Sequence, residues 1–540
     1  MVNIIVEFSK YLLIVLMTVY TYSCFSVFRY EYEEDRQQIL LRQNKLMFSI
    51  QLIAYGVMYL KTGKTEIIFF YLAQVILFLA VIALYTILYP NVSRVVINNM
   101  CMLLSIGFIM ILRLNTEKAI KQFIFVGISM IISLIVPVVI RKMKSLAEWT
   151  YIYAGVGLAA LALVAVFAVT SGGAKLGFSV AGISIQPSEF VKISFVFFVA
   201  ASLRKSTDFK NVVITTAIAA AHVLILVAST DLGAALILFV VYLIMLYVAT
   251  KQPLYLAGGM LAGSGAAVIA YHLFRHIKVR VSVWKDPFAT YETGGFQVAQ
   301  SLFAIGTGGW LGMGLCQGSP ESIPVAAEDF IFSAIVEELG LIFGLCLILV
   351  CVSCYIMFLN IAMQLRNRFY KLVALGLGTC YIFQVFLTIG GVTKFIPSTG
   401  VTLPLVSYGG SSILSTLIMF AIIQGLYILR EDEEEIIERK KARQLRDERR
   451  REAFQKETRK RKTKKKKATN KEFARVTYLF VTLFLVLMGY IVYFNVVKSE
   501  KIINSPYNTR QDTFSDRVVR GRSLTEMERY WQKRKCRRWK

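Results

Sequence analysis

Residues 231–250 read DLGAALILFVVYLIMLYVAT, a run with no charged residue after Asp231. Twenty residues of α-helix extend about 30 Å, which matches the hydrocarbon thickness of a bilayer. The chain of 540 residues is 56% hydrophobic, above the roughly 45–50% that is typical of soluble proteins. The run predicts a membrane-spanning helix, and the composition predicts an all-α polytopic membrane protein.

Similar apolar runs recur along the chain and predict fourteen membrane-spanning helices. These lie near residues 10–28, 44–60, 66–88, 96–112, 121–140, 148–170, 187–203, 211–228, 231–250, 253–272, 330–358, 369–390, 404–428 and 476–497.

Positive charge predicts the topology. Basic residues cluster in the short loops at 141–144, 204–210 and 366–371, which share one side of the membrane if the fourteen helices alternate in direction. Cytoplasmic loops are enriched in Lys and Arg. We therefore expect an extracellular N-terminus, a cytoplasmic segment at 431–475 and a large extracellular loop at 273–329.

The segment 430–475 holds 20 Lys and Arg against 11 Asp and Glu. This pattern is typical of a solvated helical linker that contacts anionic lipid. Nucleic-acid binding is the less favoured alternative, because no aromatic or groove-reading motif accompanies the charge. The cysteines show no spacing typical of a disulfide or zinc framework, so we predict no set of metal-ligating side chains.

Polar motifs concentrate on the predicted extracellular side. The loop at 273–329 includes a glycine-rich stretch at 304–314, and glycine-rich backbone can approach a ligand closely or hold an anion through its N–H groups. A transporter would place such groups near the midplane, between broken helices. The one-sided placement favours an enzyme or receptor that opens to the outer leaflet.

The roles of four acidic residues at the starts of predicted spans or within them are ambiguous. Asp329 could be an N-cap or a general base for a sugar hydroxyl, and Asp231 could equally be an N-cap. Glu337 and Glu338 lie within a predicted span, where ionisable residues are either functional or structurally paired.

A cation near the start of another span is also ambiguous. Glu189 and Lys192 share a helix face at i,i+3 and could neutralise each other, or Lys192 could bind a diphosphate substrate. The turn-rich stretch 391–412 is expected to form a re-entrant loop that lines a cavity.

Taken together, these motifs resemble the SEDS family, the FtsW/RodA/SpoVE glycosyltransferases that polymerise lipid II into peptidoglycan. The matching motifs, in family order, are Gln186-Pro-Ser-Glu189, Asp231-Leu-Gly233, Gln297 with Gln300-Ser301, Ala304-Ile-Gly-Thr-Gly-Gly309, Asp329-Phe-Ile-Phe332 with Glu337-Glu-Leu-Gly340, and Thr399-Gly400 through Ser407-Tyr-Gly-Gly-Ser-Ser412. The resemblance implies a ten-helix core at 96–430, preceded by three extra N-terminal helices at 1–95 and followed by one extra C-terminal helix.

The resemblance also implies roles for individual residues. Asp329 matches the essential acid of the family, which would deprotonate the acceptor hydroxyl. The residues implied in substrate binding are Lys192, Glu189, Gln186, Arg113, Gln122, Asp231, Arg280, Gln297, Gln300, Lys394 and Ser407. A divalent cation, Mg or Mn, is the one cofactor implied.

Three local features depart from the family pattern. The stretch 173–178 lacks the Trp that often precedes the Gln-Pro-Ser-Glu motif, and Ala326-Ala327-Glu328 stands where a His is usual before the catalytic acid. Thr230 stands before Asp231 where the family has Pro. These departures leave the expected fold unchanged and leave the local substrate contacts open.

The C-terminal part resembles the beginning of a class B penicillin-binding protein, the transpeptidase partner of SEDS enzymes. It consists of the basic linker at 431–475, an anchor helix at 476–497 and an extracellular tail at 498–540. The family continues as Ile-Leu-Asp-Arg-Asn-Gly where this chain has Ser523-Leu524. Reading the codons one base earlier restores Asp-Arg-Asn-Gly from Leu524 onward, so we hypothesise a frameshift and a tail truncated after about residue 522.

The sequence thus predicts a peptidoglycan glycosyltransferase that polymerises lipid II at the outer face of a bacterial plasma membrane, for division or elongation. The expected partners are lipid II, a class B penicillin-binding protein and the membrane, with no nucleic acid. The alternatives are a lipid II flippase and a non-catalytic scaffold of the division machinery.

Overall fold

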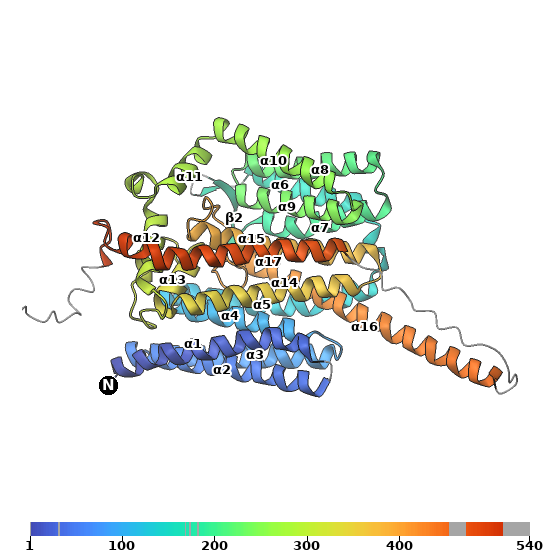
Figure 1. The fold of residues 1–540 in the computed structure, drawn as a ribbon, viewed down its shortest axis with the longest axis horizontal. Helices are drawn as coiled ribbons and strands as arrows, with labels where there is room; N and C mark the ends of the chain where they lie inside the picture. The colour runs from blue at the N-terminus through green and yellow to red at the C-terminus, as the bar shows by residue number, and fades with distance from the viewer. Residues whose placement is uncertain are drawn as a thin grey trace, which may run out of the picture.

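The computed structural model describes residues 2–30, 33–167, 169–171, 174–180, 183–452 and 471–510. Long helices run side by side, so that their connections gather at the two ends of the bundle (Figure 1). Within the described residues, twelve helices are long and apolar enough to cross a membrane. The predicted class, an all-α polytopic membrane protein, is confirmed.

All fourteen predicted runs fall on helices, but the helices at 44–60 and 187–203 are not among the twelve candidate spans, so the prediction of membrane-spanning helices is confirmed for twelve of the fourteen. The helix bounds define three groups. The N-terminal group is α1 (Val2–Ser26), α2 (Glu33–Thr62) and α3 (Glu66–Leu88). The core is α4 (Arg94–Leu114), α5 (Thr116–Lys142), α6 (Thr150–Phe167), α7 (Pro187–Lys205), α8 (Phe209–Ala228), α9 (Leu232–Thr250), α10 (Pro253–Leu273), α13 (Ile331–Leu339), α14 (Leu341–Gln364), α15 (Arg368–Val392) and α16 (Gly410–Glu452). The C-terminal group is α17 (Lys471–Tyr493), a π-helical turn at Phe494–Lys498 and α18 (Ser499–Ile503).

Two predicted helix limits are wrong. The single span expected at 330–358 is broken at Gly340, whose φ of 91° and close approach to Leu311 and Gly312 exclude a side chain. The break lets Leu341 N–H donate to the Gly309 carbonyl oxygen at 2.9 Å. The last core helix begins at Gly410 rather than 404, because Leu405 has a φ of 66° and leaves the helical conformation.

The predicted loop at 273–329 contains regular structure. It forms α11 (Arg275–Lys285) and α12 (Phe296–Gly308), with 3₁₀ turns at Tyr291–Thr293 and Pro320–Ser322. At the same end of the bundle, β1 (Val169–Ser171), β2 (Ala174–Val180) and β3 (Ile183–Ile185) form an antiparallel ribbon in which Phe178 lies opposite Ile185.

The basic loops at 141–144, 204–210 and 366–371 lie at the opposite end of the bundle, where α16 extends beyond the other helices (Figure 1). The N-terminus of α1 lies at the same end as α12. The helices therefore alternate as the charge pattern predicted.

The three N-terminal helices pack directly on the core, α1 against α14 and α2 against α4. Buried polar groups join the N-terminal helices to the core: Tyr20 OH donates to Asn99 Oδ1 at 3.1 Å, and Gln51 Nε2 donates to Ser105 Oγ at 2.8 Å. Such interhelical hydrogen bonds contribute roughly 0.6–2 kcal/mol each within a membrane. These contacts make the N-terminal group part of one bundle.

Candidate active site

Four predicted site residues line one small cavity at the α12 end of the bundle. Asp329 comes directly before α13, Arg280 lies in α11, Lys394 follows α15 and Gln297 lies in the first turn of α12. The cavity has a volume of about 180 Å³, and we refer to it as the Asp329 pocket. The structure thus brings together side chains that lie up to 114 positions apart in the sequence.

The backbone at Gly400 shapes this pocket. Gly400 has a φ of 71°, and a Cβ atom there would lie 3.5 Å from Asp329 Oδ2 and 3.9 Å from Arg280 Nη2. Residues other than glycine rarely adopt this left-handed conformation. Glycine therefore lets the segment after α15 lie against both side chains without filling the pocket.

Asp329 is the acid of the pocket, and it is not a helix cap. The residue at the N-cap position of α13 is Phe330, which excludes the N-cap interpretation. Among the described residues, no hydrogen bond or ion pair to the Asp329 side chain is formed. Burial and, to a smaller extent, the neighbouring Glu328 together raise the pKa of Asp329 to about 6, against the opposing effect of the Arg280 charge.

Arg280 and Lys394 supply the positive charge in the pocket. Arg280 Nη1 donates to the Ser398 carbonyl oxygen at 3.1 Å, and burial lowers its pKa from the usual value. Lys394 has a φ of 61°, and its carbonyl oxygen accepts a hydrogen bond from Trp284 Nε1 at 3.2 Å. Burial also lowers the pKa of Lys394. A pocket with one acid and two cations is suited to proton removal beside an anionic group.

Asp231 and Gln186 lie close to each other but outside this pocket. Asp231 is the N-cap of α9 and accepts from Ala234 N–H at 3.1 Å. It also accepts from Ser188 Oγ at 2.9 Å and from Gln186 Nε2 at 3.3 Å. The bond from Ala234 N–H confirms the N-cap interpretation, and the bonds from Ser188 and Gln186 join the start of α7 to the start of α9.

Glu189 and Lys192 form a buried ion pair. Lys192 Nζ lies 2.7 Å from Glu189 Oε1 and donates to Gln384 Oε1 at 2.8 Å. Glu189 Oε2 accepts from Ser415 Oγ at 3.0 Å. The Lys192 side chain is 1% exposed. The geometry favours the interpretation in which Glu189 and Lys192 neutralise each other. Together with Gln384 and Ser415, these two side chains hold α7, α15 and α16 together.

Gln122 and Ser407 hold the segment that precedes Asp329. Ser407 Oγ donates to the Glu328 carbonyl oxygen, and Tyr408 N–H donates to the Ala327 carbonyl oxygen at 2.8 Å. Gln122 Nε2 donates to the Ser407 carbonyl oxygen at 3.0 Å. Both predicted residues act on the position of Asp329 through the backbone.

Arg113 lies away from the Asp329 pocket, in a second cavity. Its Nε atom donates to Glu338 Oε1 at 2.9 Å, and Nη2 donates to the Gly318 carbonyl oxygen at 3.3 Å. The Glu338 side chain is fully buried. Of the two interpretations of Glu338, a functional group or a structurally paired one, the structure therefore shows the paired one.

Residues after α17 contact the same end of the molecule, which sequence reasoning missed. Arg510 Nε lies 3.0 Å from Glu337 Oε1, and both side chains are buried. Arg510 Nη1 also donates to Gln300 Oε1 at 2.5 Å, so the predicted substrate residue Gln300 has an internal partner. The ring of Tyr507 stacks on Tyr291, with centroids 4.6 Å apart.

One sequence signal could have pointed to the need for a cation here, although not to Arg510. Buried carboxylates within a helical bundle need a cationic partner, and Glu337 and Glu338 are two adjacent carboxylates within a predicted span. The hypothesised frameshift and the rest of the tail beyond residue 510 lie outside the described residues.

Within the described residues, no group of three or more His, Cys, Asp and Glu side chains is placed to hold a metal ion. Of the residues that the structure describes, Asp329 is the one carboxylate that lines the Asp329 pocket. Mg²⁺ commonly binds to one or two carboxylates together with substrate phosphates. A divalent cation would therefore fit here only if a bound substrate supplied further ligands.

Comparisons with known proteins agree with this arrangement. The model of the "Cell cycle protein" family FtsW/RodA/SpoVE matches residues 92–431. "Peptidoglycan glycosyltransferase RodA" of Mycobacterium leprae is 34% identical over an alignment of 360 residues, and the match covers 62% of this chain and 77% of that protein. "Probable peptidoglycan glycosyltransferase FtsW" of Geobacter metallireducens is 34% identical over an alignment of 284 residues, and the match covers 49% of this chain and 73% of that protein.

A solved structure shares the fold. It is described as "Structural coordination of polymerization and crosslinking by a peptidoglycan synthase complex", and it matches with a TM-score of 0.53 and 24% identity over 63% of this chain and 98% of that one. The family model, the curated relatives and the shared fold lead to one conclusion: this chain belongs to the FtsW/RodA/SpoVE family.

Proposed function

We propose that this chain is a peptidoglycan glycosyltransferase that polymerises lipid II, with Asp329 as the general base. Its family and the curated relatives named as peptidoglycan glycosyltransferases support the activity. The observation that supports the residue assignment is an Asp329 carboxylate without a hydrogen-bonding partner among the described residues, in a pocket with Arg280 and Lys394.

The proposed reaction forms one bond and breaks one. The Asp329 carboxylate removes the proton from the acceptor hydroxyl, whose oxygen attacks the anomeric carbon of the second lipid-linked sugar. The bond between that carbon and the diphosphate oxygen breaks, and the lipid diphosphate leaves with the bonding electrons. Arg280 and Lys394 are positioned to stabilise the negative charge on this leaving group.

Lys192 is assigned a different role in this proposal. Its ammonium group is already paired with Glu189 and Gln384, so it stabilises the helices beneath the site. Gln122 and Ser407 position the backbone before Asp329, and Gln297, which lines the pocket, is assigned a contact with a sugar of the substrate.

A divalent cation would be held by Asp329 and by phosphate oxygens of the substrate, and it would neutralise charge on the diphosphate. The proton transfer above depends on the protein's own carboxylate. Removal of divalent ions with EDTA, followed by titration with Mg²⁺ or Mn²⁺, would test whether one is required.

We also propose that the Asp329 end of the bundle is extracellular, together with the N-terminus. Basic loops at the opposite end support this orientation. The C-terminal anchor, which packs on α14 and α9, is proposed to represent the contact that a class B penicillin-binding protein makes with the polymerase.

Purified full-length chain supplied with labelled lipid II tests the activity, with products separated on a gel. Glycan ladders are expected from the wild type. A transporter of lipid II would move the substrate across proteoliposomes without ladders, and a scaffold would do neither. Because a polymerase could depend on a transpeptidase, a parallel reaction contains a class B penicillin-binding protein, and the absence of ladders in both reactions would contradict the proposal.

A further inference from the structure

The segment 325–329, which ends at the proposed base, begins in an unfavourable backbone conformation. Val325 has a φ of 51°, and a β-branched residue rarely adopts this left-handed conformation because its Cβ atom lies too close to the backbone. The Val325 side chain is 45% exposed, so its burial does little to offset the strain. Strained backbone persists where surrounding contacts hold it in place. The contacts around this segment therefore decide where the Asp329 carboxylate lies.

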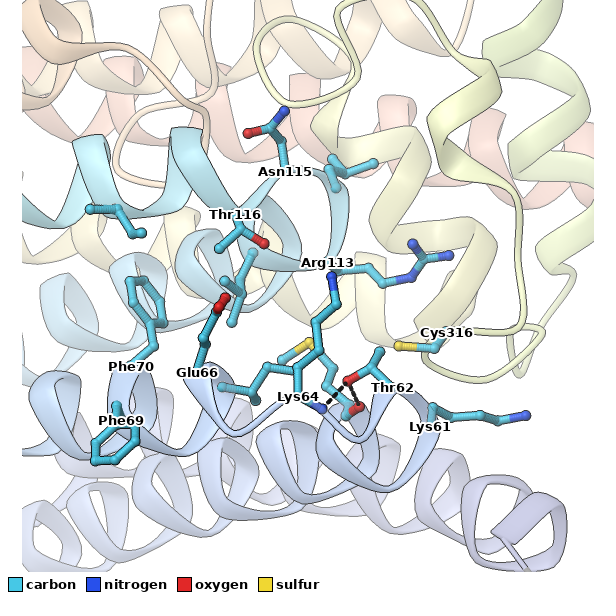
Figure 2. Close-up of a pocket in the computed structure, with 15 residues that line it drawn as sticks. Lys61, Thr62, Lys64, Glu66, Phe69, Phe70, Arg113, Asn115, Thr116 and Cys316 are labelled. Atoms are coloured by element: carbon cyan, nitrogen blue, oxygen red, sulfur yellow. Dashed lines mark hydrogen bonds between the residues drawn. The ribbon is translucent and has the colours of Figure 1, made fainter.

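The first two turns of α5 provide two of these contacts. Figure 2 shows Asn115 and Thr116 at the start of this helix, where the chain turns from α4 into α5. Asn115 is the N-cap of α5, and its side chain accepts a hydrogen bond from Lys118 N–H at 2.9 Å. Lys118 and Gln122 are four residues apart and therefore lie on the same face of the helix. Both side chains can thus act on one neighbouring part of the chain.

Lys118 binds the residue next to Asp329. Its Nζ atom lies 2.7 Å from Glu328 Oε1, and the two side chains are 37% and 25% exposed. The ammonium group also lies 5.6 Å from the centre of the Tyr408 ring, a distance at which a cation is attracted to an aromatic face. Neither Lys118 nor Glu328 lines the Asp329 pocket. The ion pair therefore acts on Asp329 from outside the pocket, through the backbone.

Gln122 holds the turn against which this segment lies. Its Nε2 atom donates to the Ser407 carbonyl oxygen at 3.0 Å, and its Oε1 atom accepts from Gly409 N–H at 3.2 Å. Between these two residues, Tyr408 N–H donates to the Ala327 carbonyl oxygen at 2.8 Å. Gln122 thus fixes the turn to which the segment 325–329 is hydrogen-bonded, and the ion pair adds a direct link from the same helix face.

We propose that the Lys118–Glu328 ion pair is a positioning device that sets the orientation of the Asp329 carboxylate toward the acceptor hydroxyl. This inference rests on the proposed function, in which Asp329 is the base. Proton transfer needs its two heavy atoms within roughly 2.6–3.2 Å of each other, and a displacement of about 1 Å can slow a reaction about 100-fold. A partly exposed ion pair contributes little to folding stability. Loss of the pair should therefore slow turnover while the protein stays folded.

The test measures initial rates of polymerisation against lipid II concentration, with purified full-length chain at pH 8. This pH is well above the pKa of Asp329, which is about 6, so a moderate change in that pKa hardly alters the amount of base. The variants are Lys118→Met, Glu328→Met and the two combined, and Lys118→Arg keeps the cation. The control is Lys121→Met, which removes an exposed charge from the same helix. Thermal unfolding verifies that every variant remains folded.

Each single variant should lower kcat about 10- to 100-fold and leave KM nearly unchanged. The double variant should be no slower than the slower single variant, because two residues that act through one contact are not additive. Lys118→Arg should keep most of the turnover, and Lys121→Met all of it. A higher KM at constant kcat would make Lys118 a substrate-binding residue and overturn the proposal, as would losses that multiply in the double variant.

Hydrogen exchange tests the same contact without catalysis. The backbone amides at 325–329 and at Tyr408 should exchange faster in Lys118→Met than in the wild type, and at the wild-type rate in Lys121→Met. If the wild type forms no glycan ladders, the proposed function fails, and exchange alone then decides whether the ion pair holds the segment. Equal exchange in the wild type and Lys118→Met would overturn the proposal, whatever the activity.

Discussion

The Asp329 pocket and the buried cluster around Lys192 both contain carboxylate and cationic side chains, but the carboxylate is paired only in the cluster. In the cluster, Lys192 is paired with Glu189 and Gln384, and Glu189 also accepts from Ser415. In the pocket, the Asp329 side chain has no hydrogen bond or ion pair among the described residues. A satisfied charge network stabilises a structure, whereas an unpaired acid near cations is available to a ligand.

This difference separates two kinds of motif residue that look alike in sequence. Glu189, Lys192 and Asp231 occur in motifs that resemble the family as closely as that of Asp329 does. Their side chains are nevertheless occupied by neighbouring helices, so we assign them to the scaffold. Substitutions that disrupt one of these sites at a time distinguish the two kinds of residue.

The largest effect is expected from Asp329→Asn, which keeps the shape of the side chain but removes the base. Loss of a general base slows a reaction about 100- to 10,000-fold, so glycan ladders should disappear at fixed protein concentration. Glu292→Gln in the same segment between α10 and α13 is the matched control, since the Glu292 side chain is exposed and does not line the pocket. Retained polymerisation by Asp329→Asn would place the base elsewhere.

Breaking the buried cluster should reduce stability instead. Lys192→Met leaves the Glu189 carboxylate buried without its cation, which costs about 3–5 kcal/mol in the free energy of unfolding. The unfolding midpoint in detergent should fall clearly, and Glu189→Gln/Lys192→Met should recover most of it because no charge remains buried. A single variant as stable as the wild type would show that the ion pair contributes little.

Arg510→Met probes the contact between the C-terminal segment and α13. It leaves Glu337 without its cation, and we expect a loss of up to about 3 kcal/mol, smaller than for Lys192, because the segment after α17 can detach and admit water. Adding Glu337→Gln should restore the unfolding midpoint. If Arg510→Met alone leaves the midpoint unchanged, the contact is not stabilising.

The smallest expected effect is on pH dependence. Asp329 has a pKa of about 6 and must be deprotonated to act as a base, so the initial rate should rise as the pH increases through 6. The positive charge of Arg280 lowers this pKa, and Arg280→Met should therefore move the rising limb to higher pH, by up to about one unit.

The control for this shift is Lys278→Met, which removes an exposed charge from the same helix, α11. This control should leave the pH of the rise in rate unchanged. If the rate rises at the same pH in the wild type and in Arg280→Met, Arg280 does not act on the titrating group.

The sequence was sufficient to locate every long helix and the end of the bundle that holds the site, because hydropathy and loop charge are local signals. It was not sufficient at Gly340, since the helix break depends on hydrogen bonds with the glycine-rich backbone at 309–312. It also singled out Asp329 as the candidate base, but only the three-dimensional contacts separated this residue from Asp231, which also precedes a helix.

The Arg510–Glu337 pair could not have been predicted from local patterns. The two residues are 173 positions apart, and neither belongs to a motif that specifies the other. The same reason explains why Lys192 remained ambiguous, since Gln384 and Ser415 come from helices that only the fold brings together.

The most direct measurement compares lipid II polymerisation by Asp329→Asn and by Glu189→Gln/Lys192→Met in one gel experiment, at protein concentrations corrected for the folded fraction. The pocket variant should give no ladder, and the cluster variant should give ladders close to those of the wild type. Ladders from Asp329→Asn and none from the folded cluster variant would reverse the assignment and place the chemistry at Lys192.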